Sequence, residues 1–236
     1  MIKAVCFDLD DTLFDYRGFM SGCEKYLCQI SADALGVSTS RCRSVYRRTK
    51  RNLYRDRPLD PAIFDWGERI SGLLAALGVE AEETTVEWLR SAFWMRFISA
   101  IEPYPDSKPV LEALRESGRR IALISNGIRE TQVLKLERLG LSGLFDAEVY
   151  SSDVDANKPA PGIFRRCLAD LGTRARHSLM VGDLTYVDVK GAKAVGMRTC
   201  WFRAGIHSEL GPSDPSEEPD LVVSRLSELP KLIDLL

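Results

Sequence analysis

A group of acidic residues follows the first apolar run of the sequence, where Phe7 leads directly into Asp8-Leu9-Asp10-Asp11-Thr12. Three further polar groups follow later apolar runs: Ser125-Asn126-Gly127, Asn157-Lys158-Pro159, and Gly182-Asp183 with Asp188. A lone pair of aspartates after a strand is weak evidence, because acidic turns are common there. Four polar groups that each follow an apolar run predict one shared site.

Carboxylates gathered in this way need compensating positive charge. Two unit charges about 4 Å apart repel by roughly 4 kcal/mol at an effective dielectric constant of 20. Clustering Asp8, Asp10, Asp183 and Asp188 therefore requires a cation, and hard oxygen ligands favour Mg²⁺ over zinc or copper. Phosphate esters are anionic and resist anionic attack, so a metal beside a nucleophile suits phosphoryl transfer.

The remaining polar residues fit the same chemistry. Lys158 supplies a fixed positive charge, and Ser125 with backbone N–H groups at a helix start can bind phosphate oxygens. Each residue also has a structural interpretation when taken alone: Ser125-Asn126 as a helix cap, Lys158 as a solvated surface charge, Asp183 as an Asx-turn. Their joint occurrence favours the functional interpretation.

The elements that must position these residues alternate along the chain. Six short apolar runs predict strands of a parallel sheet buried on both faces: Lys3 to Phe7, Arg120 to Ser125, Phe145 to Ser151, Ser178 to Gly182, Arg198 to Phe202 and Leu221 to Val223. Four helical patterns lie between them: Ser107 to Ser117, Arg129 to Leu139, Pro161 to Leu171 and Tyr186 to Val195. The alternation predicts a doubly wound α/β fold, which binds ligands beyond the carboxyl ends of its strands.

The region from about Phe14 to Ala100 breaks this alternation and predicts roughly four helices. Asp60-Pro61 and Thr84-x-x-Glu87 are typical of helix starts. A parallel crossover needs only about a dozen residues, so the much longer connection implies an inserted helical module. We expect a core domain of residues 1–14 and 101–236 and a helical domain of residues 15–100. Hinges are expected near Asp15 to Gly18 and near Pro103 to Pro105.

Composition narrows the function classes. The 236 residues carry a net charge of −2 with 45% hydrophobic and 28% charged residues, which is typical of a globular protein and argues against nucleic acid as a main partner. No run approaches the roughly 20 apolar residues that cross a bilayer, and no signal-peptide pattern follows Met1, so we expect a cytoplasmic protein without a membrane partner. Six scattered cysteines suit reduced core thiols better than disulfides or zinc.

The arginine-rich segment within the helical region has two interpretations. Its cations are Arg41, Arg43, Arg47, Arg48, Lys50, Arg51, Arg55 and Arg57. A run of charges in a helix usually forms a solvated face, and this is the favoured interpretation. The alternative is that some of these residues attract an anionic substrate.

The polar groups together resemble the four ordered motifs of the haloacid dehalogenase (HAD) superfamily. Asp8 to Thr12 matches its Asp-x-Asp-x-Thr motif, Ser125 and Lys158 match the next two, and Asp183 to Asp188 matches the last. The match covers the α/β portion, about two thirds of the chain. The resemblance implies a Rossmann-like core, and the inserted α-helical module is similar to the C1 cap of that superfamily.

The resemblance also implies roles for individual residues. Asp8 would attack phosphorus, and Asp10 would protonate the leaving group and then activate water. Asp8, the Asp10 carbonyl and Asp183 would bind Mg²⁺, and Asp188 would either bind it through water or orient Lys158. The residues that would hold the phosphoryl group are Thr12, Ser125, Asn126 and Lys158. Asp11 is expected to be structural because the motif leaves its position open.

Several alternatives stay open. A haloacid dehalogenase would lack the second motif aspartate and would need no magnesium, and the presence of Asp10 favours phosphate chemistry. Phosphomutases share all four motifs, so a mutase is a second alternative. A third alternative, from a different class of protein, is a non-catalytic module that senses phosphate or binds a partner. The intact motifs argue against this third alternative. The expected substrate is a small phosphorylated metabolite, such as a sugar phosphate or a nucleoside monophosphate, acted on by a monomer or homodimer.

Residues of the cap that face the substrate are harder to predict. Six candidates lie in the helical region: Tyr16, Arg17, Phe19, Tyr46, Arg47 and Trp66. Aromatic residues at helical spacing are more often part of a core, so none of these is assigned to the site.

Overall fold

The structure is a computed structural model that describes residues 1–56, 65–204 and 211–236. This part of the chain contains a six-stranded sheet in the order β3-β2-β1-β4-β5-β6, and all neighbouring strands are parallel. The strands are β1 (Ala4–Phe7), β2 (Arg120–Ser125), β3 (Ala147–Tyr150), β4 (Ser178–Gly182), β5 (Arg198–Phe202) and β6 (Leu221–Val223). All six predicted strands are confirmed, although β3 is shorter than its apolar run.

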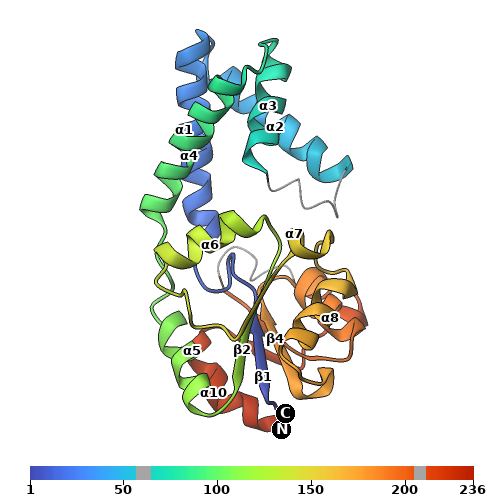
Figure 1. The fold of residues 1–236 in the computed structure, drawn as a ribbon. Coiled ribbons are helices and arrows are strands. Elements are labelled where there is room, and N and C mark those ends of the chain that lie inside the picture. The colour runs from blue at the N-terminus through green and yellow to red at the C-terminus, as the bar shows by residue number, and fades with distance from the viewer. Residues whose placement is uncertain (57–64, 205–210) are drawn as a thin grey trace.

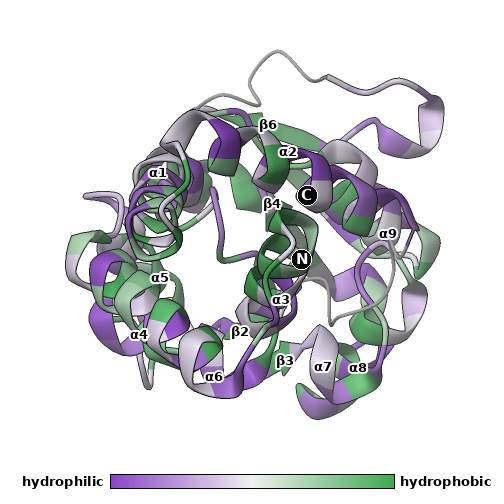
Figure 2. Cartoon of the chain, turned by 90° about the horizontal axis from the view of Figure 1, so that it is seen from above, coloured by the Kyte–Doolittle hydropathy of each residue, from purple (hydrophilic) through white to green (hydrophobic). Residues whose placement is uncertain are grey.

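Side chains of the sheet alternate between two apolar cores. Val5 and Phe7 of β1 belong to one cluster, and Ala4 and Cys6 belong to the other. The first face is covered by α5 (Ser107–Glu116) and α10 (Leu229–Leu232), and the second by α8 (Pro161–Asp170) and α9 (Lys190–Ala194). Figure 2 shows α5 and α8 on opposite sides of β2 and β3. The doubly wound α/β architecture is thus confirmed.

Four helices lie between β1 and α5 in the described part of the chain. They are α1 (Tyr16–Leu35), α2 (Thr39–Asp56), α3 (Trp66–Leu77) and α4 (Glu83–Ala100), as the sequence predicts. Figure 1 shows them beyond the carboxyl edge of the sheet, at the end of the molecule opposite the two termini. The bounds of the two expected domains stay a prediction.

The starts of these helices differ from the predicted ones. Asp60-Pro61 lies outside the described residues, and α3 begins after Asp65, whose side chain accepts a hydrogen bond from Gly67 N at 2.6 Å. Thr84 is not the N-cap of α4, because the carbonyl of Glu82 already accepts the first helical hydrogen bonds. The capping-box prediction for Thr84 was therefore wrong.

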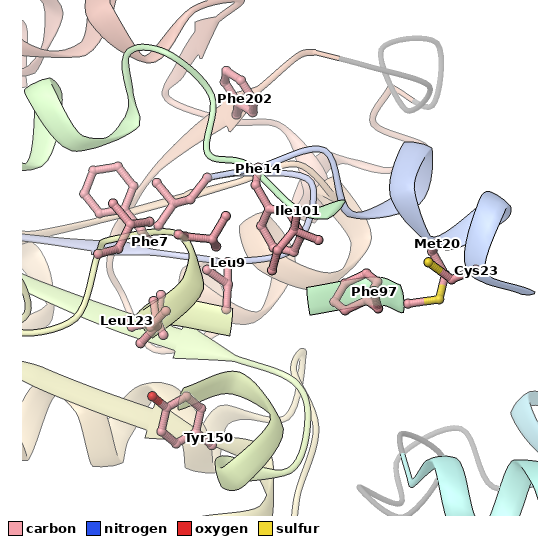
Figure 3. Close-up of a cluster of buried hydrophobic side chains, with 14 of the residues drawn as sticks. Phe7, Leu9, Phe14, Met20, Cys23, Phe97, Ile101, Leu123, Tyr150 and Phe202 are labelled. Carbon is pink, nitrogen blue, oxygen red and sulfur yellow. The ribbon is translucent and has the colours of Figure 1, made fainter. Parts of the chain in front are cut away.

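The first apolar core continues from the sheet into the helical region. Phe7 and Leu9 lie at the sheet, Phe14 and Ile101 lie beyond them, and Phe97 of α4 extends the cluster toward α1 (Figure 3). The outgoing and returning segments are also tied together, since Leu13 O accepts hydrogen bonds from Tyr104 N at 3.0 Å and Ser107 Oγ at 2.7 Å. These contacts fix where the helices leave and rejoin the sheet.

Two further expectations concern the whole chain. All six cysteines are free and buried, as expected for reduced core thiols. Within residues 1–56, 65–204 and 211–236, no helix is both long and apolar enough to span a bilayer.

One glycine of α9 is required by close packing against the segment that contains Lys158. A Cβ atom on Gly191 would lie 2.4 Å from a ring carbon of Phe164 and 3.0 Å from Pro159 Cα. Gly72 in α3 offers a contrast, because a Cβ atom there would meet nothing within 4 Å.

We predict that Gly191→Ala lowers the free energy of unfolding by about 1–3 kcal/mol, because the added methyl group overpacks this contact. Gly72→Ala should instead raise it by about 0.5–1 kcal/mol, since alanine loses less backbone entropy in a helix. Urea denaturation of both variants measures the difference. Similar effects at the two positions would contradict the close packing of Gly191.

Candidate active site

The predicted site residues meet at the carboxyl edge of the sheet. β2 and β3 lie on one side of β1, and β4 to β6 lie on the other, so the strand order reverses at β1. Ligands of open parallel sheets bind at such a point. Asp8 follows β1, Ser125 ends β2 and Asp183 follows β4. The topology therefore brings residues distant in sequence to one location.

Lys158 is the central cation of this location. Its Nζ atom donates to Asp8 Oδ1 at 2.6 Å and to Asp188 Oδ1 at 2.7 Å, and its side chain is 2% exposed. Burial lowers the pKa of the Lys158 ammonium, but the charges of Asp188 and Asp8 outweigh burial and raise it overall. Lys158 therefore stays protonated and links two of the four carboxylates.

Asn126 holds the backbone that presents Lys158. Its side-chain oxygen accepts a hydrogen bond from Lys158 N at 2.7 Å, and its Nδ2 donates to Lys158 O at 3.2 Å. Asn126 also lines the cavity described below, so it can face a ligand while it fixes the position of the lysine.

Three aspartates form a group suited to a metal ion. Ligand oxygens of Asp8, Asp183 and Asp188 all lie within 4.8 Å of one another. Asp183 Oδ2 is buried and accepts no hydrogen bond from the described residues. Burial raises the pKa of Asp183 well above its usual value, and the charges of Asp188 and Asp8 raise it further. An unsatisfied buried carboxylate among hard oxygen donors fits a divalent cation such as Mg²⁺.

The segment after β4 determines the position of Asp188. Residues Thr185–Val189 form one π-helical turn, so the predicted helix from Tyr186 continues regularly only as α9. Asp188 Oδ2 accepts a hydrogen bond from Leu184 N at 3.1 Å, and a Cβ atom on Gly182 would lie 2.3 Å from Asp188 Cγ. The glycine before Asp183 thus leaves space for Asp188. Burial raises the pKa of Asp188 to about 6, although Lys158 opposes the shift.

Asp10 has a partner that sequence reasoning missed. Lys135 Nζ lies 2.9 Å from Asp10 Oδ1 and 2.8 Å from Oδ2. Burial raises the pKa of Asp10, while the charge of Lys135 lowers it. On the same helix, α6 (Arg129–Arg138), Gln132 donates from Nε2 to Ser125 Oγ at 2.7 Å.

The sequence contains a signal that could have identified Lys135. Gln132, Lys135, Leu136 and Leu139 are spaced as the buried stripe of a helix, and all four are buried. A lysine within such a stripe needs a charged or polar partner, because an unpaired buried charge is costly.

A cavity of about 420 Å³ lies at these residues. Its lining includes Asp8, Asp10, Ser125, Lys158, Asp183 and Asp188 from the strand ends, and Tyr16, Arg17 and Tyr54 from α1 and α2. The volume is in the range of roughly 300–1,000 Å³ that is usual for small-molecule sites. Both the sheet and the helical region therefore bound the ligand space.

Other predicted residues lie elsewhere. Thr12 is fully buried and does not line this cavity. Of the six cap candidates, Tyr16 and Arg17 line it, and Phe19, Tyr46, Arg47 and Trp66 do not. Asp11, expected to be structural, pairs with Arg17 at 3.1 Å.

The arginines of α2 do not reach the cavity. Arg41, Arg43, Arg47, Arg48, Arg51 and Arg55 are exposed and none lines it. This agrees with a solvated cationic face. Lys50 pairs with Glu24 at 2.5 Å, and Arg57 lies outside the described residues.

The parallel sheet, with clustered carboxylates and a buried lysine at its switch point, has the arrangement that the sequence motifs predict. The model of the haloacid dehalogenase-like hydrolases matches residues 2–196, and the chain belongs to this family of enzymes. A glyceraldehyde 3-phosphate phosphatase of Methanopyrus kandleri is 30% identical over 97% of this chain and 96% of its own length.

Two solved structures share the fold over the whole chain. A HAD phosphatase from Thermococcus onnurineus has a TM-score of 0.77 and 27% identity, with 98% of both chains covered. A 2-haloacid dehalogenase from Pseudomonas syringae pv. Tomato has a TM-score of 0.75 and 25% identity, covering 100% of this chain and 99% of its own. The family resemblance seen in the motifs is confirmed.

We predict that Asp183→Asn raises the melting temperature of the chelator-treated protein at about pH 7.5. Each kcal/mol added to the free energy of unfolding should raise the melting temperature by roughly 2–4 °C. A carboxyl whose pKa is higher in the folded than in the unfolded state loses its stabilising contribution as the pH rises through the folded pKa. The neutral amide avoids that loss. Differential scanning calorimetry measures the change.

The same substitution has two internal controls. At a pH low enough to protonate Asp183 in both the folded and the unfolded state, the variant and the original protein should differ little. Added Mg²⁺ should raise the melting temperature of the original protein and not that of the variant. A variant that melts lower at pH 7.5 without metal would contradict the assignment of Asp183 as an uncompensated buried charge.

Proposed function

We propose that this chain is a Mg²⁺-dependent phosphohydrolase that cleaves a small phosphate monoester through an aspartyl-phosphate on Asp8. The observation that carries the proposal is the shared contact of Asp8 and Asp188 with Lys158 Nζ, at 2.6 and 2.7 Å, in the lining of a cavity of about 420 Å³. A nucleophilic carboxylate beside a fixed cation and a metal-binding carboxylate group can approach an anionic ester.

In the first step, a carboxylate oxygen of Asp8 forms a bond to phosphorus. The bond between phosphorus and the ester oxygen breaks, and that oxygen keeps the electron pair. Asp10, two residues further along and in the same cavity, donates a proton to it. Burial raises the pKa of Asp10, which favours the protonated form that this step needs.

In the second step, water attacks the phosphorus of the aspartyl-phosphate. The Asp10 carboxylate accepts a proton from this water, and the bond between phosphorus and the Asp8 oxygen breaks. Inorganic phosphate leaves, Asp8 returns as a carboxylate, and Asp10 is protonated for the next cycle.

The phosphoryl group would be held by residues of several strand ends. Lys158 neutralises its charge, and Ser125, Asn126 and the N–H groups at the start of α6 can donate to its oxygens. Gln132 donates to Ser125 Oγ at 2.7 Å, which leaves the Ser125 hydroxyl hydrogen available for a ligand. The assignment of Thr12 to this group stays a prediction from the motif.

Mg²⁺ would be held by Asp8, Asp183, the Asp10 carbonyl and Asp188, the last directly or through water. When bound, it would supply charge neutralisation for the phosphoryl group and its surrounding carboxylates. The unsatisfied Oδ2 of Asp183 supports this assignment. Asp188 contacts Lys158 at 2.7 Å, which supports an orienting role for it as well.

The substrate is proposed to be a small phosphorylated metabolite. The Methanopyrus kandleri relative is a glyceraldehyde 3-phosphate phosphatase that aligns over nearly the whole of both chains, which supports a short sugar phosphate. Tyr186 lines the cavity and offers its hydroxyl group to a hydroxyl or carbonyl oxygen of such a substrate. A nucleoside monophosphate is the alternative.

Dehalogenation is the alternative reaction that the structural comparison raises. Release of a halide from carbon needs neither a proton donor nor a metal. The presence of Asp10 and of the three-aspartate group supports phosphate chemistry instead. A mutase would share these residues, and its distinguishing test is transfer of the phosphoryl group to a second substrate.

We predict that the purified protein hydrolyses p-nitrophenyl phosphate with Mg²⁺, and that chelation or Asp8→Asn abolishes this activity. The amide of the variant cannot attack phosphorus. Release of p-nitrophenolate measures the reaction, and Asp170→Asn, an exposed aspartate of α8, is the matched control. Full activity of the Asp8 variant would refute the proposed nucleophile.

A second prediction separates the two reactions. Incubation with glyceraldehyde 3-phosphate should release inorganic phosphate, whereas 2-chloropropionate should release no chloride, because the acid and metal groups serve an oxygen leaving group. Phosphate and chloride assays with and without Mg²⁺ measure both. Chloride release that persists with chelator would favour a dehalogenase, and a parallel test of uridine 5′-monophosphate ranks the substrate classes.

A further inference from the structure

Lys135 is a buried charge that the proposed mechanism leaves without a role. It lies on α6 and its side chain is 4% exposed. Burial lowers the pKa of its ammonium, and the charge of Asp10 opposes that shift. A buried lysine costs stability unless its contacts compensate, so those contacts indicate what it does.

The first set of contacts is to Asp10. Both carboxylate oxygens lie at almost the same distance from Lys135 Nζ, 2.9 and 2.8 Å. An ammonium at equal distances from both oxygens lies close to the line of the Cβ–Cγ bond, so it holds the position of the carboxyl group relative to α6. A proton donor needs such a fixed position to stay within reach of the leaving oxygen.

The second set of contacts comes from the helical region and its linker. Lys135 Nζ lies 4.6 Å from the ring centre of Tyr16, 5.8 Å from Phe97 and 5.9 Å from Phe14. Tyr16 begins α1, and Phe97 is near the end of α4. The ring centre of Tyr16 lies 6.1 Å from that of Phe14 and 5.8 Å from that of Phe97, and both phenylalanines belong to the apolar cluster of Figure 3. These aromatic rings stabilise the ammonium and keep water from it.

We propose that Lys135 is a positioning residue that holds the Asp10 carboxyl group in place for proton transfer, and that the packing of α1 and α4 on α6 keeps Lys135 there. The inference rests on the proposed function. Lys135 gains and loses no proton in this scheme: the proton given to the leaving group comes from Asp10 and returns to Asp10 from water.

The test compares leaving groups, because only a poor one needs the acid. Lys135→Met should lower the single-turnover rate of phosphoryl transfer from glyceraldehyde 3-phosphate by about 10²-fold, the lower end of the usual contribution of general acid catalysis. The same step with p-nitrophenyl phosphate, whose leaving group is stable without a proton, should change little. The KM for both substrates should also change little.

Two comparisons identify Asp10 as the residue through which Lys135 acts. In an Asp10→Asn background, Lys135→Met should cause no further loss for glyceraldehyde 3-phosphate. Lys135→Gln keeps one donor and should recover part of the rate. Additive losses in the double variant, or equal losses with both leaving groups, would overturn the inference.

Arg138→Met is the matched control for docking of the helices. Arg138 lies one turn further along α6 and donates to Ile98 O at 2.8 Å and Ser99 O at 3.2 Å, at the end of α4, without contacting Asp10. It should not show the dependence on the leaving group. The same dependence in Arg138→Met would assign the effect to docking alone and overturn the role of Lys135.

The outcomes also separate this inference from the proposed function. An original protein without phosphatase activity would refute the proposed function, whereas an active one with no selective loss in Lys135→Met would refute only the role of Lys135. Near-UV circular dichroism verifies folding of each variant. If the methionine variant does not fold, the glutamine variant takes its place in the same comparison. Its rate should then fall with glyceraldehyde 3-phosphate, which has the poor leaving group, and stay unchanged with p-nitrophenyl phosphate.

Discussion

The crowding of four carboxylates at one edge of the sheet is the constraint on which the site depends. Oxygens of Asp8, Asp183 and Asp188 lie within 4.8 Å of one another, and Asp10 lines the same cavity. Two unit charges about 4 Å apart repel by roughly 4 kcal/mol at an effective dielectric constant of 20. Two buried lysines oppose this repulsion: Lys158 links Asp8 with Asp188, and Lys135 holds Asp10. Asp183 makes no ion pair with a described residue, and it is the carboxylate with the strongest case as a metal ligand.

Several irregular features of the fold serve this charge arrangement. Asn126 fixes the backbone of Lys158, the π-helical turn directs Asp188 back toward it, and Gly182 leaves room for the Asp188 carboxylate. The regular parts of the sheet bring the strand ends together. The final positions of the charged groups, however, come from side-chain contacts between loops and helices that are distant in sequence.

These two levels differ in how far they can be predicted from sequence. Strands buried on both faces leave continuous apolar runs, which is why β2, β4, β5 and β6 match their predicted bounds. Motif aspartates could be found because they follow those runs. Lys135 was missed because a lysine in a helix normally faces solvent, and only its place in the buried stripe distinguishes it. Local patterns also cannot say which aromatic residues of a helical region face a cavity and which, like Tyr46, pack in its interior.

The contacts of Tyr16 connect the ligand space to the acid–base group. Its ring centre lies 4.6 Å from Lys135 Nζ, and the same residue lines the cavity. Any movement of α1 relative to the sheet therefore changes the shape of the cavity and the surroundings of Lys135 together. In the proposed scheme, Asp10 is held in its proton-donating position only when α1 is packed against α6. The helices that enclose the substrate in that scheme would then also hold the acid, which would restrict proton transfer to the enclosed state and keep bulk water from the leaving group.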